Sequence, residues 1–148
     1  GEVHIAVLPE PMVTIARAAN PELTAALDLT AEWDKVSEAG SLVQGCVVVR
    51  KAFADEHPNE VKAFLDEYKA SIEFLTAEPE QAGQMIQDAG IFAKAAVAAK
   101  AIPNCNVCFV SGAEMQAPLT AFLTALSTVA PQSIGGSVPG DDFYCVLK

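Results

Sequence analysis

The segment from Leu42 to Arg50, LVQGCVVVR, limits most strongly what this chain can fold into. It is a continuous apolar run that contains three consecutive valines, and β-branched residues favour extended strands. An apolar run without polar alternation is typical of a strand covered on both faces, as in a parallel or mixed sheet flanked by helices. We therefore predict an α/β fold in which 42–50 is a buried strand. Gly45 within it indicates a bend, a bulge or a close approach of another backbone.

Three shorter segments have the same extended character. Strands are predicted over 3–8, 24–29 and 104–110, where apolar and β-branched residues recur over short lengths. The connection over 30–41 has no periodic pattern and contains Trp33, the one tryptophan of the chain. We expect this residue to anchor the connection, with stacking on an aromatic ligand as the alternative.

Prolines mark where the predicted helices begin and end. Because proline lacks an amide hydrogen, it fits the first turn of a helix, and it disfavours helical backbone in the residue before it. Helices are therefore predicted over 10–20, from Pro58 to 78, over 79–89 and over 91–101. A last helix should follow Ser111, which forms a capping-box pattern with Glu114. Pro118 either kinks this helix or moves its start to about Ala117.

The helix from Pro58 has the clearest amphipathic pattern, with apolar residues three or four positions apart. They are Val61, Phe64, Leu65, Tyr68, Ile72 and Leu75. Beyond the last helix, a turn-rich tail over 133–145 carries aromatic residues that should dock it. The predicted strands are too few for a complete sheet, so we expect the chain to be a fragment of a larger α/β protein.

Composition excludes several classes of partner. The 148 residues are 51% hydrophobic and carry a formal net charge of −10. Nucleic acid and anionic lipid both require clustered basic residues, so neither is an expected partner. No apolar run reaches the roughly 18–20 residues needed to span a bilayer, and no signal segment is recognisable in the chain. We expect no cofactor and no metal.

The chemically reactive residues form no convincing catalytic arrangement. Cys105 and Cys108 make a C-x-x-C pattern, which is half of a zinc site or a redox pair, but no second ligand pair exists. Small residues within a strand are the favoured interpretation. His4 and His57 have no nucleophile beside them, and the adjacent carboxylates Asp141 and Asp142 should point apart. We therefore do not expect an enzyme.

Several patterns, taken in order, resemble the SsuA/TauA-like group of solute-binding proteins in the periplasmic-binding-protein type II superfamily. The first strand and turn match as Gly1-Glu2-Val3-His4-Ile5-Ala6 and Leu8-Pro9-Glu10-Pro11, although His4 replaces the usual aspartate. The next match is Val47–Arg50 followed by Phe53, Ala54 and Pro58. The tail matches at Gly135-Gly136, Pro139, Asp141, Phe143 and Tyr144. The resemblance covers the whole chain but corresponds to the carboxy-terminal half of such a protein.

The resemblance implies an extracytoplasmic component of an ABC importer, which captures a small organic solute by closing two lobes around it and delivers it to a permease. Residues 1–41 would then be the remainder of the second lobe, 42–50 the crossing strand and hinge, and 51–148 the helical return portion of the first lobe. As a partial fold, the chain should self-associate or exchange elements between copies. The alternatives are an enzyme of the same superfamily, such as a thiamine-pyrimidine precursor synthase, and a cysteine-based redox or metal module.

The resemblance also implies where solute contacts lie. Glu10, Pro11 and Met12 form the strand-to-helix turn, and Gln44 and Gly45 stand at the entry of the crossing strand. The Glu10 carboxylate could accept a hydrogen bond from the solute or cap its own helix. Met12 is a cleft wall residue or a core residue, and Gln44-Gly45 is a hinge or an ordinary bend. These five residues are the predicted solute-binding site.

Overall fold

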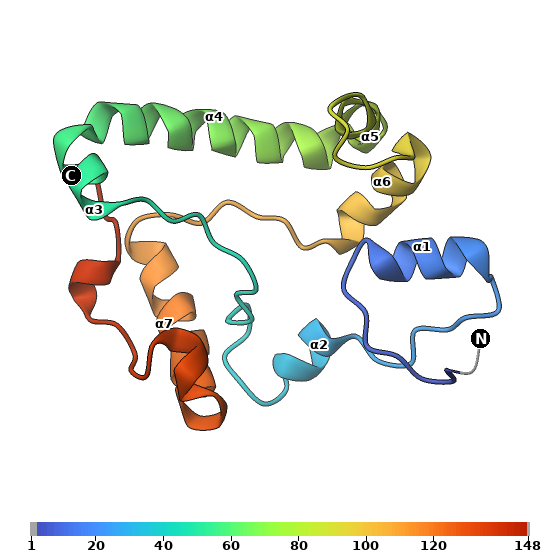
Figure 1. The fold of residues 1–148 in the computed structure, drawn as a ribbon, viewed down its shortest axis with the longest axis horizontal. Coiled ribbons are helices and arrows are strands. Elements are labelled where there is room, and N and C mark those ends of the chain that lie inside the picture. Colours follow the sequence, from blue (N-terminus) through green and yellow to red (C-terminus); the bar gives the residue numbers. More distant parts are fainter. Residues whose placement is uncertain (1–2, 148) are drawn as a thin grey trace. The chain divides into compact units, whose positions relative to one another are not determined.

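A computed structural model describes residues 3–147, and this part of the chain contains helices and no strand (Figure 1). Helices account for 57% of it. The α-helices are α1 (Met12–Ala19), α2 (Leu29–Trp33), α3 (Lys51–Glu56), α4 (Pro58–Ala77), α5 (Pro79–Asp88), α6 (Ala95–Ala101) and α7 (Ala113–Val129). Three short 3₁₀ turns follow as η1 (Ile102–Asn104), η2 (Pro131–Ile134) and η3 (Asp141–Phe143). None of the described helices is both long enough and apolar enough to cross a bilayer.

The predicted α/β fold is therefore wrong for the described structure. The segments 3–8, 42–50 and 104–110 contain no β-ladder, and the segment over 24–29 runs into α2. A strand needs a second strand to satisfy its backbone amides and carbonyls, and no described segment supplies one. Most of their side chains are exposed, with Ile5 at 90% and Val48 at 75% of full exposure. The first two residues of the matched amino-terminal motif, Gly1 and Glu2, lie outside the described residues.

The helices were predicted far better than the strands. Pro58 and Pro79 are the first residues of α4 and α5, as predicted. Helix α5 also closes at Gly90 as predicted, with φ of 70°. The Gly90 amide donates to the Gln87 carbonyl at 2.9 Å and the Ile91 amide to the Ile86 carbonyl at 3.0 Å. This pair of bonds is the Schellman motif, which satisfies carbonyls that the helix end leaves open.

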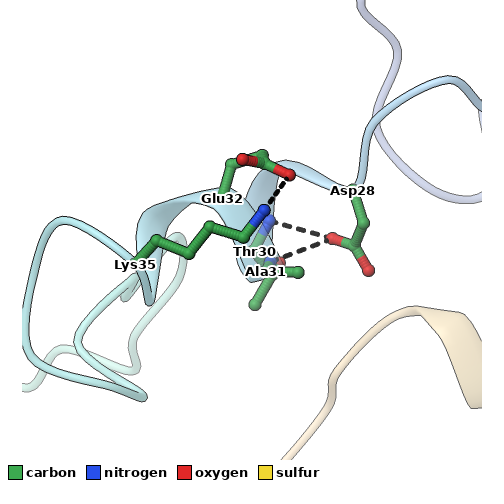
Figure 2. A network of polar contacts seen from close by, with 5 residues as sticks. All are labelled: Asp28, Thr30, Ala31, Glu32 and Lys35. Atoms are coloured by element: carbon green, nitrogen blue, oxygen red, sulfur yellow. Dashed lines mark hydrogen bonds and ion pairs between the residues drawn. The ribbon is translucent and has the colours of Figure 1, made fainter.

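Two short helices, α2 and α3, were not predicted. Figure 2 shows how Asp28 starts α2, because its carboxylate accepts the Thr30 amide at 2.9 Å and the Ala31 amide at 3.4 Å. Glu32 and Lys35 add an exposed ion pair of 2.7 Å at the end of this turn. Aspartate is among the best residues for capping a helix start, so Asp28 was the overlooked sequence signal.

The start of α7 differs from the prediction. The residue before the helix is Gly112, with φ of 62°, and no side chain caps the helix. The capping box between Ser111 and Glu114 is therefore not formed. Pro118 lies inside α7, which runs from Ala113 to Val129 without interruption, so Pro118 does not move the start to Ala117.

The described chain forms two compact units. The first contains the residues up to Ala25 together with Asp66–Phe109, and the second contains Ala26–Leu65 and the residues from Val110 onward. The division passes through α4. The division at 41 and 50 that the resemblance implies concerns the lobes of a larger protein, and it stays a prediction.

The core of the first unit is the contact between α5 and α6, which is built from small residues. Ala82, Ala98 and Ala101 are buried, as is Ile102 at the end of α6. Gly83 allows the closest approach, since a Cβ added there would lie 2.6 Å from the Ala95 carbonyl oxygen. The side chain of Gln87 also accepts the first amide of α6, at Ala95, over 2.8 Å.

The core of the second unit forms around Trp33 and the carboxy-terminal tail. Trp33 packs edge-on against Phe122 with ring centroids 5.7 Å apart, and its indole nitrogen donates to the buried Ser41 hydroxyl at 2.9 Å. Tyr144 is buried and its hydroxyl lies 2.7 Å from that of Thr120 on α7. These contacts confirm the anchoring role of Trp33 and the docking of the tail through an aromatic residue.

Replacing Gly83 with alanine should destabilise the first unit. The added methyl group would press on the Ala95 carbonyl and the Ala99 backbone, at a cost of about 1–3 kcal/mol for overpacking. The higher helix propensity of alanine returns at most about 1 kcal/mol. Urea unfolding followed by circular dichroism should therefore show a net loss for Gly83→Ala. Gly45→Ala is the control, because a Cβ there meets no atom within 4 Å, and an equal loss in both variants would contradict the prediction.

The exposed extended segments predict self-association of the chain. The backbone over 3–8 and 42–50 has no ladder partner, and most of the β-branched side chains there are exposed. Such segments favour pairing with the same segments of another copy. Light scattering after size exclusion should give a mass well above 15.5 kDa. The double substitution Ile5→Lys and Val48→Lys should lower the mass, whereas Val36→Lys, exposed but outside these segments, should not. A compact and stable monomer of the unsubstituted chain would refute this.

Candidate groove between the first and sixth helices

A groove of about 470 Å³ lies between α1 and α6 in the first unit. Its α1 wall consists of Thr14, Arg17 and Ala18. Arg17 and Ala18 follow Thr14 by three and four positions, so both neighbour it on the helix surface. Pro21 extends this wall beyond the helix end. The opposite wall consists of Ala96, Val97 and Lys100 of α6, with Asn104 in the turn that follows. The groove is open to solvent, because Arg17, Ala18, Ala96 and Lys100 are all exposed.

Two cations and no carboxylate line this groove. Arg17 extends from the last turn of α1 and Lys100 from the last turn of α6. Within residues 3–147, neither forms an ion pair. The groove is therefore lined by positive charge on a chain whose net charge is −10.

Polar groups beside the two cations add hydrogen-bonding capacity. Thr14 carries a hydroxyl on the α1 wall. The Asn104 side-chain nitrogen donates to the Lys100 backbone carbonyl at 3.4 Å, which orients its amide at the edge of the groove. The remaining lining is apolar, from Ala18, Pro21, Ala96 and Val97. The groove thus has cationic and polar side chains together with apolar lining residues.

The predicted site residues at the start of α1 adjoin the groove without lining it. The half-buried Glu10 carboxylate accepts the Thr14 backbone amide at 3.1 Å, so it satisfies one of the free amides at the helix start. Pro11 directly precedes α1, and the Glu10–Pro11 peptide bond is cis. Met12 is the first residue of α1 and is exposed. Glu10 therefore has the helix-capping role, while solute contact by these three residues stays a prediction.

Gln44 and Gly45 belong to the second unit, within the extended segment over 42–50. Both are exposed. A Cβ at Gly45 would have no atom within 4 Å, so no other backbone approaches it closely. Of the alternatives for Gly45, the close approach is thus removed. The hinge remains a prediction.

A second hollow, of about 240 Å³, lies between the end of α4 and α5. Phe74, Leu75, Met85 and Ile86 are among its apolar lining residues, and Ser71 is its one polar lining side chain. It therefore offers apolar contact but few groups that could orient a polar solute.

The cysteines and histidines form no ligand cluster within residues 3–147. No group of three or more histidine, cysteine or acidic residues there could hold a metal ion, and the four cysteines are free. Desolvation, and to a smaller extent the negative charge of Glu10, raise the pKa of the Cys105 thiol. His4 lies in the first unit and His57 in the second, where it pairs with Glu60 at 3.8 Å.

Comparison with protein-family models, with curated proteins and with solved structures finds no match for this chain.

The groove itself was not predicted from the sequence. Arg17 and Lys100 lie far apart in the sequence, with α2 to α5 between their helices. Only the packing of α1 against α6 brings these two helices together. The available signal was weak: each is a lone cation in the last turn of a helix, where the helix dipole already favours it.

Replacing Glu10 with glutamine should accelerate alkylation of Cys105. A raised pKa lowers the fraction of reactive thiolate near neutral pH, and removing the Glu10 charge lowers the pKa. Because desolvation is the larger cause and remains, the gain should stay below about tenfold, the change that a full pKa unit would give. Iodoacetamide labelling at pH 7.5 with peptide mass spectrometry measures the rate. Glu22→Gln is the control, and an unchanged rate for Glu10→Gln would contradict the prediction.

Proposed function

We propose that this chain is part of an extracytoplasmic solute-binding protein of an ABC importer, in which it helps to capture a small organic solute. The resemblance described above, carried by residues from Val3 to Tyr144, supports the assignment. The observation that carries it is the groove between α1 and α6. Its volume of about 470 Å³ falls within the roughly 300–1,000 Å³ of ordinary small-molecule sites.

The composition of the groove also favours binding. Small-molecule sites are mostly apolar, with a few polar groups that set the orientation of the ligand. Here Ala18, Pro21 and Val97 supply apolar surface, and Arg17 and Lys100 supply charge. A transport protein needs such reversible contacts and no reactive group, since the solute leaves unchanged.

Capture by closure requires a flexible connection. Gln44 and Gly45 are the proposed hinge, because Gly45 has no neighbouring atom where a side chain would stand. Hinges are a few loop residues that absorb large changes in backbone angle. The location outside the cytoplasm and the permease partner belong to the same proposal.

A thermal-shift panel tests this function with the 148-residue chain. It should include thiamine precursors, sulfonates, nitrate and aromatic acids, together with neutral amides and amines. A specific solute at about 100 times its Kd should stabilise the chain by roughly 2.7 kcal/mol, which corresponds to an increase in Tm of several degrees. Mass spectrometry of the recovered solute shows whether it was bound unchanged or chemically converted.

Each result of the panel decides between the alternatives. A stabilising solute that is recovered unchanged supports a binding protein. A solute that is converted supports the enzyme alternative, and stabilisation by metal ions alone supports the cysteine-based module. A flat response to the entire panel would overturn the proposed function.

A further inference from the structure

We propose that Cys105 and Cys108 are a redox-active pair, which closes to a disulfide across the turn at Asn106 by exchange with a small-molecule disulfide. The four cysteines are free, so the structure shows the dithiol form of this pair. The proposal goes beyond the proposed function and does not depend on it, because capture of a solute requires neither thiol.

The structure removes the interpretation that the sequence favoured for this motif. Small residues within a buried strand should be covered and have a ladder partner, but no strand forms over 104–110 and both cysteines are exposed. Free cysteine is among the residues most often buried in proteins, so two exposed thiols need a different explanation. Exposure makes both of them accessible to a small disulfide in solution.

The backbone between the two cysteines contains the turn that a disulfide requires. In an extended chain, Cα atoms three positions apart lie about 10 Å from each other, whereas a disulfide requires about 4.4–6.8 Å. Here Cys105 has helical backbone angles, with φ of −76° and ψ of −8°, and Asn106 is left-handed with φ of 51°. The chain therefore turns at these two residues, and a turn brings nearby Cα atoms to within about 7 Å of one another.

The other two cysteines are poorer partners for this pair. Cys105 and Cys108 belong to the first unit, whereas Cys46 and Cys145 belong to the second. Every pairing other than that of Cys105 with Cys108 also closes a far longer loop, and the entropy lost on closure grows with loop length. Thiol exchange should therefore select the bond between Cys105 and Cys108.

The exchange transfers two electrons and two protons. The thiolate of one cysteine attacks a sulfur of a small disulfide such as oxidised glutathione, which breaks the small disulfide and leaves a mixed disulfide on the protein. The thiolate of the second cysteine then attacks the protein sulfur of the mixed disulfide. Each departing small thiolate takes up one of the protons that the cysteines lose, so one small disulfide becomes two small thiols. An excess of the small thiol reverses both steps.

Closure should also restrain one edge of the groove between α1 and α6. Asn104 lines the groove, directly precedes Cys105, and donates its side-chain amide to the Lys100 carbonyl at 3.4 Å. The Cys105 amide donates to the Ile102 carbonyl at 3.1 Å, at the end of η1. A disulfide at Cys105 therefore limits the backbone freedom of the segment that carries Asn104.

Peptide mass spectrometry of the 148-residue chain in glutathione redox buffers tests the proposal. Remaining thiols are alkylated, and cleavage after glutamates places Cys105 and Cys108 in the peptide 81–114 and the other two cysteines in separate peptides. We expect 81–114 to lose two hydrogens in the oxidising buffer and to regain them in excess reduced glutathione. Replacing both Cys46 and Cys145 with serine should leave the closed fraction unchanged.

Substitution within the pair tests whether closure is intramolecular. In Cys108→Ser the second step has no attacking thiolate, so Cys105 should keep one glutathione as a mixed disulfide. The unsubstituted chain should show no such adduct at equilibrium, because Cys108 displaces it. An equal yield of the adduct in both chains would contradict closure.

Variants of Asn106 test the role of the turn. Glycine adopts positive φ readily, so Asn106→Gly should close as readily as the unsubstituted chain. Valine disfavours a left-handed backbone, so Asn106→Val should lower the equilibrium constant of closure about tenfold. Circular dichroism of both variants should match that of the unsubstituted chain, so that loss of closure is not loss of folding. Equal closure in the two variants would show that the turn does not bring the thiols together.

The remaining outcomes also overturn the proposal. Glutathione on both Cys105 and Cys108 without a disulfide would show that they are independent exposed thiols. A bond from either of them to Cys46, to Cys145 or to another chain on a non-reducing gel would assign a different pairing. Thiols that stay reduced throughout the buffer series would exclude the redox role. In each of these cases the proposed function still has its own test in the thermal-shift panel.

Discussion

The close contact between α5 and α6 at Gly83 is the constraint on which the first unit depends. With hydrogen in place of a side chain, the backbone of α5 can lie against the Ala95 carbonyl and Ala99 of α6. The buried alanines on either side make the same approach possible along the rest of the contact. Because α6 forms one wall of the groove, the position of Lys100 follows from this contact. The cationic wall of the groove is thus held in place by a contact between glycine and alanine residues.

The parts of the structure that could be predicted are those specified by neighbouring residues. A proline at a helix start and a glycine at a helix end act within one turn, so α4 and α5 were predicted with the correct first residue and the closure at Gly90. Trp33 and Tyr144 were also correctly expected to anchor their segments. Helix α2 is the exception. Its cap, Asp28, is also a local signal, but it lies within the apolar segment over 24–29 that was predicted as a strand.

The strands failed for the opposite reason. The β-branched residues of 42–50 favour an extended backbone, and the segment contains no helix, but a strand exists only when a partner pairs with it. No local pattern reveals whether a partner is within reach. The groove was not predicted for the same reason, since Arg17 and Lys100 come to line one groove through the packing of separate helices. Of the predicted site, Glu10 and Pro11 have observed hydrogen bonds beside the groove, and both bonds are to amides of α1, those of Thr14 and Ile15.

The overall charge of −10 does not act equally over the whole molecule, because at physiological ionic strength the interaction of exposed charges decays over about 8 Å. The potential in the groove is therefore set by the groups that line and border it, and these include Arg17 and Lys100 but no lining carboxylate. Glu10, the acid that adjoins the α1 wall, has its charge directed to the Thr14 amide. On a chain with a net charge of −10, the groove thus places two cationic side chains in a lining that contains no carboxylate.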